Sequence, residues 1–392
     1  MSFQRWLVLA FLGVGWLAAA ACAPAPQPAP AQPAAAKPAP QAPPAAAQPA
    51  PAKPAEQAPA APAQQAAPKP AAQQPARVYK VRIATSIPEK PDGLSDAWAL
   101  AAFAERIKQR SNGQLDAQVF WAGSLYGEVA ALKAMLDGAI EVGAASVQNH
   151  GTFSNAFFVL DMPFLFRSAD EEMKAVVDGP FNKRLKELFV KDQPNAIPLM
   201  LTVNGGLRDL ACSRQVITPT DLRGIKIRTT ENPVDVSVWK TLGAIATPIA
   251  WGETYTAGTQ NLIQCLAAAP DFWLIGAKHY EWTKHITRIG YLTQVRGTNI
   301  SKKFFDSLPP NLQKIALDTA AEVEKEANEV DKRYGGKWLD WLKSEGKQEI
   351  HELTPEQKQQ WVDRARPVYD EFKGKIPAGL LEDMQNHLKT LR

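Results

Sequence analysis

Arg228 is the residue whose type and position suggest ligand chemistry most directly. It closes the segment Thr218–Arg228 (TPTDLRGIKIR), in which proline and glycine indicate a turn and the last residues alternate like a short strand. Ligands of open α/β sheets bind at the carboxyl ends of strands, where Arg228 would lie. A planar guanidinium suits a bidentate grip on a carboxylate there, although an ordinary surface arginine is the simpler interpretation of this motif alone.

The other motifs argue against an enzyme. The sequence contains no G-x-S-x-G nucleophile motif, no P-loop and no H-E-x-x-H zinc motif. Its five histidines form no i, i+4 pair and no zinc-type cluster with cysteine. We interpret His279 and His285, which flank aromatic residues, as helix-surface or packing residues. We therefore predict no cofactor, no metal site and no catalytic residue, although a triad assembled only in space would leave no such motif.

The elements that would position Arg228 begin with a β-α-β-α-β order. We predict strands over 78–84, 115–120 and 140–147, separated by helices over 96–110 and 128–136. This order is typical of a parallel sheet covered by helices.

A second α/β region follows the first. It contains predicted strands over 198–203, 207–212 and 291–295 and a long predicted helix over 311–335. Gly205-Gly206 lacks the spacing of a dinucleotide-binding motif and indicates a turn or hinge. Residues 78–392 are enough for two α/β lobes with substantial cores.

The N-terminal residues predict export. Arg5, an apolar run and four small residues make a signal peptide over 1–22. Small residues directly before Cys22 are typical of a bacterial lipoprotein, so we predict a lipid anchor on Cys22 at the periplasmic or extracellular face of a membrane. Ordinary cleavage near Ala21, with Cys22 an incidental thiol, is the alternative. A disulfide between Cys212 and Cys265 and a pair of buried thiols are both consistent with an exported chain.

Residues 23–77 are predicted to be a disordered linker. Residues 23–76 are all Ala, Pro, Gln, Lys or Glu, which offer nothing to bury in a core. Alternating Ala and Pro favour polyproline II, so the linker would be a semi-rigid spacer with a contour on the order of 150 Å. The net charge is only +4, and no basic run with interleaved aromatics predicts a nucleic-acid partner.

Five motifs in the folded region occur in an order that points to one family. The chain resembles the DctP-like family of extracytoplasmic solute-binding subunits of TRAP transporters, over nearly all of 78–392 and as a lipid-anchored member. The motifs are Phe120–Leu125 (FWAGSL) with Leu136–Val142 (LDGAIEV), Asp161–Phe166 (DMPFLF), Thr218–Arg228, Leu242–Pro248 with Trp251–Ala257 (WGETYTA), and Phe305–Pro309 (FDSLP).

The resemblance implies an α/β fold of the type II periplasmic-binding-protein class. Two lobes, about 78–204 plus 296–335 and about 205–295 plus 336–392, would be joined by crossing hinge strands and a long spanning helix. The protein would capture an organic acid and deliver it to the membrane subunits of a TRAP permease. A binding protein that senses a ligand for a signalling partner, or an exported enzyme on a similar fold, are the alternatives.

The resemblance also implies which residues contact the ligand. Arg228 would hold the carboxylate, Arg208 would assist it, and Trp251 would pack on the ligand. Polar contacts would come from two loops, with the residues Thr85, Ser86, Ser146, Gln148 and Asn149.

One stretch departs from the family. Where relatives carry a polar Asp-Gly-Gln-Glu-Asn-Pro-like segment, this chain reads Gln264–Pro270 (QCLAAAP), followed by Phe272 and Trp273. We infer a more apolar pocket wall that includes Trp273, and a ligand with a sizeable apolar or aromatic portion. The alternative is that the alanines only pack behind the pocket.

Overall fold

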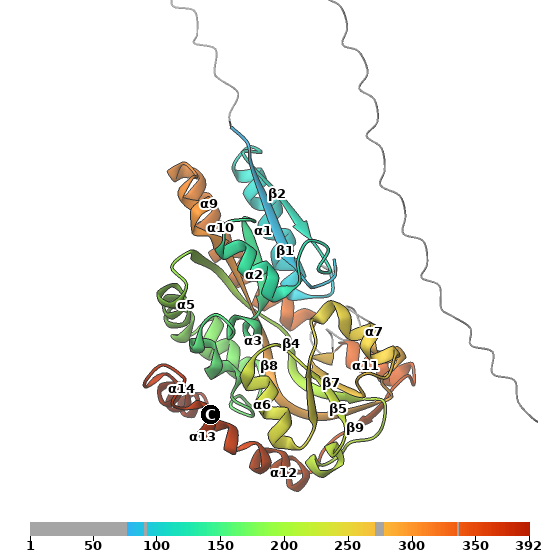
Figure 1. Cartoon of the computed structure of the whole chain (residues 1–392). Helices are drawn as coiled ribbons and strands as arrows, with labels where there is room; N and C mark the ends of the chain where they lie inside the picture. Colours follow the sequence, from blue (N-terminus) through green and yellow to red (C-terminus); the bar gives the residue numbers. More distant parts are fainter. Residues whose placement is uncertain (1–76, 90–91, 271–277, 335–336) are drawn as a thin grey trace, which may run out of the picture. The chain divides into compact units, whose positions relative to one another are not determined.

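The computed structural model describes residues 77–89, 92–270, 278–334 and 337–392 (Figure 1). The predicted signal peptide, Cys22 and all of the linker except Arg77 lie outside these residues, as does Trp273. The described residues belong to one unit, 71–392. No helix in the described ranges combines the length and the apolar composition that a membrane span requires.

One sheet runs through the described residues in the order β2-β1-β3-β8-β4-β7-β5-β6, with β9 paired to β8. β1 is parallel to β2 and β3, and β5 is parallel to β6 and β7, as the β-α-β order predicts. The strands are β1 (Tyr79–Thr85), β2 (Leu115–Phe120), β3 (Val142–Ser146), β4 (Ala196–Cys212), β5 (Lys226–Thr229), β6 (Ile245–Pro248), β7 (Cys265–Ala268), β8 (His285–Ser301) and β9 (Glu349–His351).

β4 and β8 are the long strands that connect the two ends of the sheet (Figure 1). Each has 17 residues, and they pair antiparallel from Ala196 opposite Ser301 to Cys212 opposite His285. The prediction of two separate strands around Gly205-Gly206 is wrong, because β4 continues through them. The register shifts there, and both glycines have positive φ, 78° and 86°, a conformation that costs glycine little. The glycines bend the strand without ending it.

Helices cover the sheet (Figure 1). The α-helices are α1 (Ser95–Arg110), α2 (Glu128–Leu136), α3 (Val147–His150), α4 (Ala169–Glu172), α5 (Phe181–Asp192), α6 (Pro233–Leu242), α7 (Thr254–Thr259), α9 (Lys302–Asp306), α10 (Pro310–Tyr334), α11 (Lys337–Ser344), α12 (Pro355–Ala365), α13 (Pro367–Phe372) and α14 (Leu380–Thr390).

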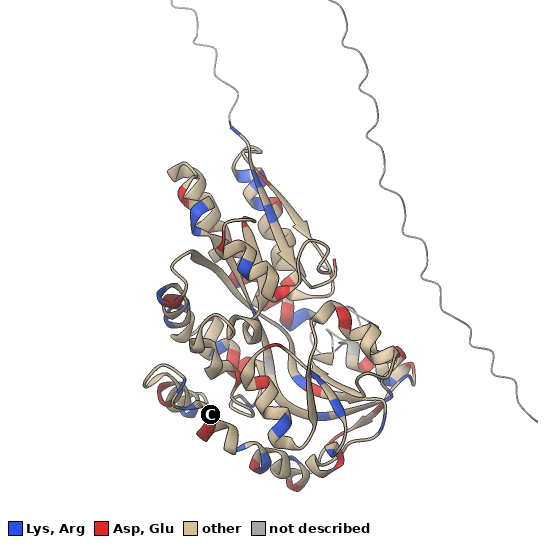
Figure 2. Ribbon diagram, viewed as in Figure 1, with Lys and Arg blue, Asp and Glu red and all other residues tan. Residues whose placement is uncertain are grey.

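The long helix α10 confirms the prediction for 311–335. It buries Leu312, Ala316, Ala320 and Val323 at the spacing of one helix face. Glu322 and Glu326 on another face of α10 make partly exposed ion pairs with Arg106 of α1. Acidic and basic residues are interspersed along the described parts of the ribbon (Figure 2).

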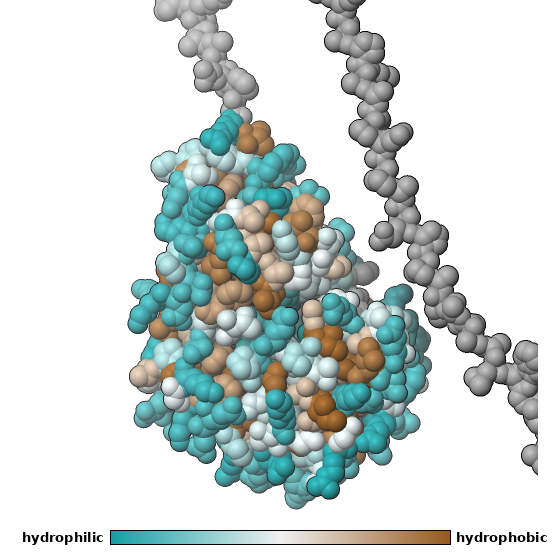
Figure 3. All heavy atoms as spheres, in the orientation of Figure 1, coloured by the Kyte–Doolittle hydropathy of each residue, from teal (hydrophilic) through white to brown (hydrophobic). Residues whose placement is uncertain are grey.

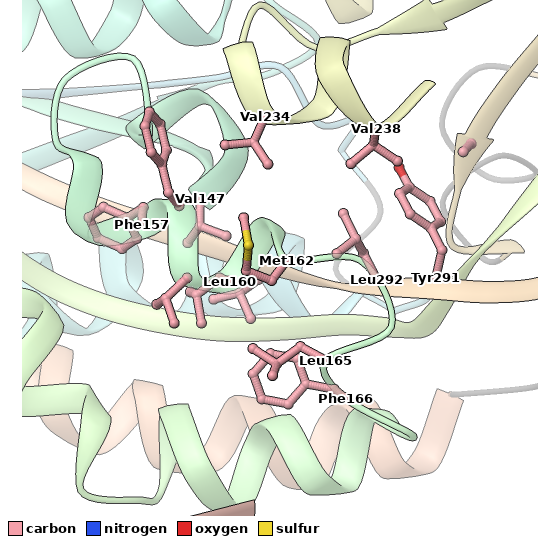
Figure 4. Packing of buried hydrophobic residues seen from close by; sticks show 14 of the residues in the cluster. Val147, Phe157, Leu160, Met162, Leu165, Phe166, Val234, Val238, Tyr291 and Leu292 are labelled. Atoms are coloured by element: carbon pink, nitrogen blue, oxygen red, sulfur yellow. The ribbon is translucent and has the colours of Figure 1, made fainter. Parts of the chain in front are cut away.

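Buried apolar side chains fill the space between the sheet and its helices. Figure 4 shows Met162 packed among Val147, Leu160 and Val234, residues that come from three separate segments. On the outer face seen in Figure 3, hydrophilic side chains dominate and apolar ones gather in small groups. A second core cluster packs β1 and α1 against α10, with Ile83, Phe103 and Leu312 fully buried.

Cys212 and Cys265 are joined by a disulfide bond. They lie directly opposite each other in the antiparallel pair of β4 and β7. The sequence left open a disulfide or a pair of buried thiols, and the structure contains the disulfide. A disulfide fits a chain that is exported to an oxidising compartment.

Candidate functional site

A small pocket lies where several strands of the sheet end. Ser146 is the last residue of β3, Ala268 is the last residue of β7, and Arg228 is next to the end of β5. The carboxyl ends of parallel strands are where open α/β sheets bind ligands. The pocket holds about 20 Å³ of solvent-accessible space. It is lined by Glu128, Ser146, Arg208, Arg228, Thr230, Trp251, Ala267, Ala268, Gln294 and Arg296.

Arg228 is held at the pocket by a backbone oxygen and an aromatic ring. Its side chain is buried, and its Nε donates a 2.9 Å hydrogen bond to the carbonyl of Ile249. Its guanidinium carbon lies 5.5 Å from the centroid of the Trp251 ring, within cation–π range. Burial lowers the pKa of Arg228, and the nearby charge of Arg208 lowers it further. The bond to Ile249 is made by Nε. It therefore does not use the two Nη atoms, which together can form two parallel hydrogen bonds to a carboxylate.

Arg208 is positioned by an amide network behind the pocket. Its Nη2 donates to Oε1 of Gln148 at 2.6 Å. The Gln148 side chain is oriented in turn, because its Nε2 donates to Asp161 at 2.8 Å. Asn232 donates both to Asp161 and to the Gln148 carbonyl. Burial raises the pKa of Asp161 to about 8. Within the described structure Nε of Arg208 is buried without a hydrogen-bond partner, so it is a donor that a ligand oxygen could satisfy.

Arg296 on β8 differs from these two arginines, because it is paired with carboxylates. Its Nη1 donates to Glu128 at 2.8 Å, and its Nε lies 3.3 Å from Asp96. Burial raises the pKa of Asp96 to about 6 against the opposing effect of Arg296. Burial acts in the same direction on Glu128, but Arg296 and hydrogen bonds from Ser86 and Ser146 outweigh it, so the pKa of Glu128 is lowered. Glu128 is therefore ionised and neutralises Arg296.

Three of the predicted polar contacts bind Glu128. Its carboxylate accepts hydrogen bonds from the Ser86 hydroxyl at 2.6 Å, the Ser146 hydroxyl at 2.7 Å and Nδ2 of Asn149 at 2.7 Å. Thr85 is fully buried at the end of β1. Of these four predicted residues, only Ser146 lines the pocket. As contacts to a ligand, all four stay predictions.

Sequence reasoning missed Glu128 and Arg296. The two residues are 168 positions apart, so no local motif links them. The available signal for Glu128 was its place directly after Gly127 at the start of a helix. Arg296 lay one residue beyond the predicted strand 291–295, and β8 extends to Ser301.

The sequence left open whether the alanines of Gln264–Pro270 line the pocket or pack behind it, and the structure contains both arrangements. Ala267 and Ala268 line the pocket. Ala269 is fully buried and is not among the lining residues. The described part of this wall is therefore apolar at two positions, and the predicted contribution of Trp273 lies outside the described residues.

His279 and His285, which we interpreted as helix-surface or packing residues, lie in different settings. His279 is fully buried beside Trp251 and hydrogen-bonds to Thr254 and Trp282, as a packing residue would. His285 begins strand β8, so it is not on a helix surface; it is half-buried and packs beside the ring of His351, which agrees with the packing interpretation.

Comparison with known proteins supplies the observation that decides the family. The model of bacterial extracellular solute-binding protein, family 7 (DctP) matches residues 91–375. The chain belongs to this family. The resemblance drawn from the five motifs is thereby confirmed, whereas the lipid anchor on Cys22 stays a prediction.

This family 7 solute-binding protein has relatives with named ligands. It is 26% identical over 316 residues to the C4-dicarboxylate-binding periplasmic protein DctP of Vibrio cholerae. This alignment covers 78% of this chain and 89% of the relative. It is also 26% identical over 262 residues to the 2,3-diketo-L-gulonate-binding periplasmic protein YiaO of Escherichia coli. This alignment covers 66% of this chain and 78% of the relative.

Solved structures confirm the predicted fold of the family 7 protein. A sugar acid binding protein of Advenella mimigardefordensis in complex with galactonate matches with a TM-score of 0.74 and 24% identity, covering 81% of this chain and 99% of that one. A TRAP periplasmic solute-binding protein of Shewanella oneidensis with bound succinate matches with a TM-score of 0.73 and 20% identity. The match covers 79% of this chain and 99% of that one. The fold is the two-lobed α/β fold of periplasmic binding proteins.

Proposed function

We propose that this solute-binding protein captures an organic acid by its carboxylate, between Arg208 and Arg228, and delivers it to a TRAP-type permease. One observation carries the proposal. Both guanidiniums are buried at one small pocket, and each donates to a neutral oxygen, that of Gln148 or that of Ile249. Buried charges are costly unless they are paired, so the pocket favours an anion. The relatives named for dicarboxylates and sugar acids support the same ligand class.

The small size of the pocket supports capture by closure. About 20 Å³ accommodates one or two water molecules, whereas an organic acid needs far more room. Glu128 and Ser146 reach the pocket from one predicted lobe, and Arg208, Arg228 and Trp251 from the other. β4 and β8 would act as the hinge, since both cross from one lobe to the other. The ligand would enter an open form and favour closure by contacting both lobes.

Export and anchoring complete the proposal. The signal peptide, a lipid on Cys22 and a spacer over 23–77 would hold the binding domain near the membrane that contains the permease. The family is one of solute-binding proteins, and we propose that this member performs no chemistry on its ligand.

A thermal-shift screen of the purified protein against a carboxylate library tests the proposal. A ligand present at a hundred times its dissociation constant stabilises the folded state by about 2.7 kcal/mol, so binders should raise the melting temperature by a few degrees. Recovery of the unchanged acid after incubation would support simple binding. A library in which uncharged sugars stabilise the protein and acids do not would overturn the carboxylate assignment.

Gln148 should prove to be a positioning residue for Arg208. We expect Gln148→Met to weaken binding of the identified acid by about threefold to tenfold, because Arg208 loses the acceptor that fixes its guanidinium. Isothermal titration calorimetry measures the change. Gln118→Met on the exposed surface of β2 is the matched control and should bind like the wild type. Equal affinity in Gln148→Met and the control would remove Gln148 from the site.

A further inference from the structure

We propose that His285, Glu349 and His351 form a binding site for a divalent transition metal such as Zn²⁺, outside the ligand pocket. The three side chains come together where β9 pairs in parallel with β8. His285 lies directly opposite Glu349 in this pairing, and His351 is two residues further along β9. Residues two apart on a strand point to the same face, so both β9 side chains lie on the side of His285.

The ligand atoms have the separations of a metal shell. Two ligands bound to zinc at 2.0–2.1 Å with a tetrahedral angle lie about 3.3 Å apart. Nδ1 of His285 lies 3.2 Å from Nε2 of His351 and 3.4 Å from Oε2 of Glu349. The three ligand atoms all lie within 4.8 Å of one another. The distance between Glu349 and His351 would have to shorten, and the two imidazole rings, which face each other with centroids 5.4 Å apart, would have to turn so that their nitrogens converge on the metal. The Glu349 side chain is 72% exposed, so it has room to move.

The chemistry of the three ligands selects the class of metal. Two imidazoles and one carboxylate suit Zn²⁺, Co²⁺, Ni²⁺ and Cu²⁺, whereas Mg²⁺ and Ca²⁺ prefer oxygen ligands alone. Three protein ligands leave a fourth position for water, which can reach this partly exposed place. None of the three residues lines the ligand pocket. The spacing rules applied to the sequence could not find the site, because His285 and His351 are 66 residues apart.

The position of the site indicates what a metal would do. β9 is the short strand that precedes the C-terminal helices α12, α13 and α14. A metal bound to both strands would cross-link β9 to β8 and so fix the C-terminal segment to the sheet. Because the metal binds the folded arrangement, it should stabilise the protein against unfolding.

The test uses tag-free purified protein, stripped with a chelator. We expect one Zn²⁺ per chain by isothermal titration calorimetry and a higher melting temperature with Zn²⁺ but not with Mg²⁺ or Ca²⁺. We expect His351→Gln and Glu349→Gln each to weaken Zn²⁺ binding by about tenfold or more, because loss even of a group that only orients a metal ligand costs about that much. Glu352→Gln, a neighbouring carboxylate outside the cluster, is the matched control. Glu349→Gln is an exposed substitution that leaves folding intact, so the test does not depend on the histidine variants.

Cobalt spectroscopy separates this site from a thiolate site at Cys22. Co²⁺ bound to nitrogen and oxygen ligands gives visible d–d bands without thiolate charge transfer, and these bands should persist in Cys22→Ser. The proposal is overturned if Zn²⁺ leaves the melting temperature unchanged. It is also overturned if Glu349→Gln and His351→Gln bind Zn²⁺ as tightly as Glu352→Gln does. In either case the 3.2 Å contact is only a hydrogen bond between two imidazoles.

Discussion

Replacing Arg228 by alanine is expected to weaken binding of the acid by about tenfold to a hundredfold while the fold survives. A hydrogen bond to a charged group contributes about 1.5–3 kcal/mol, and each 1.4 kcal/mol is a factor of ten in affinity. Arg228→Lys should also bind more weakly, because an ammonium cannot form two parallel bonds to a carboxylate. Calorimetric titration with the best binder from the screen measures both variants.

Arg223→Ala is the matched control for the Arg228 variants. Arg223 belongs to the same TPTDLRGIKIR segment, but it is exposed and does not line the pocket. Its removal should leave the affinity unchanged. If Arg228→Ala and Arg223→Ala bind the acid equally well, Arg228 does not hold the carboxylate.

Replacing Arg296 by methionine is expected to destabilise the fold by about 3–5 kcal/mol, because it removes the arginine that neutralises the buried carboxylate of Glu128 and lies 3.3 Å from that of Asp96. Arg106→Met provides the contrast. Its ion pairs with Glu322 and Glu326 are partly exposed to solvent, so its loss should cost about 1 kcal/mol, less than the loss of the buried Arg296. Chemical denaturation of both variants at neutral pH measures the difference.

The effect of Arg296→Met should depend on pH. In the wild type the folded pKa of Glu128 is lowered, so this group contributes stability above its ordinary pKa, and the contribution is lost as the pH falls through the folded value. In the variant, the buried carboxylate of Glu128 lacks its arginine, so it costs most when it is ionised and least when it is protonated. The difference in unfolding free energy between wild type and variant should therefore shrink as the pH falls from neutral to about 4. A pH-independent difference would mean that the loss is one of packing.

The local patterns of the sequence were enough to predict the order of strands and helices and the pocket residues that carry a motif. Arg228 and Trp251 both line the pocket, and each belongs to a recognisable segment. Where the sequence misled, a non-local contact decides the structure. Gly205-Gly206 has the composition of a turn, yet pairing with β8 on both sides keeps β4 continuous.

The supporting network could not be predicted for the same reason. Ser86 and Asn149 were expected to face the ligand, since the loops that carry them do so in the family. In this structure both donate to Glu128, and Glu128 is held by Arg296 from a distant strand. Such an ion pair depends on how β3 and β8 come together, and this is a property of the whole sheet.

Titration of wild type and Arg228→Ala with an acid ligand and with its neutral primary amide tests the central claim most directly. The four affinities form a cycle that isolates the interaction between the guanidinium and the carboxylate. Changing acid to amide should cost the wild type about tenfold to a hundredfold and cost Arg228→Ala much less. An equal loss in both proteins would show that the carboxylate is bound elsewhere and would contradict the account.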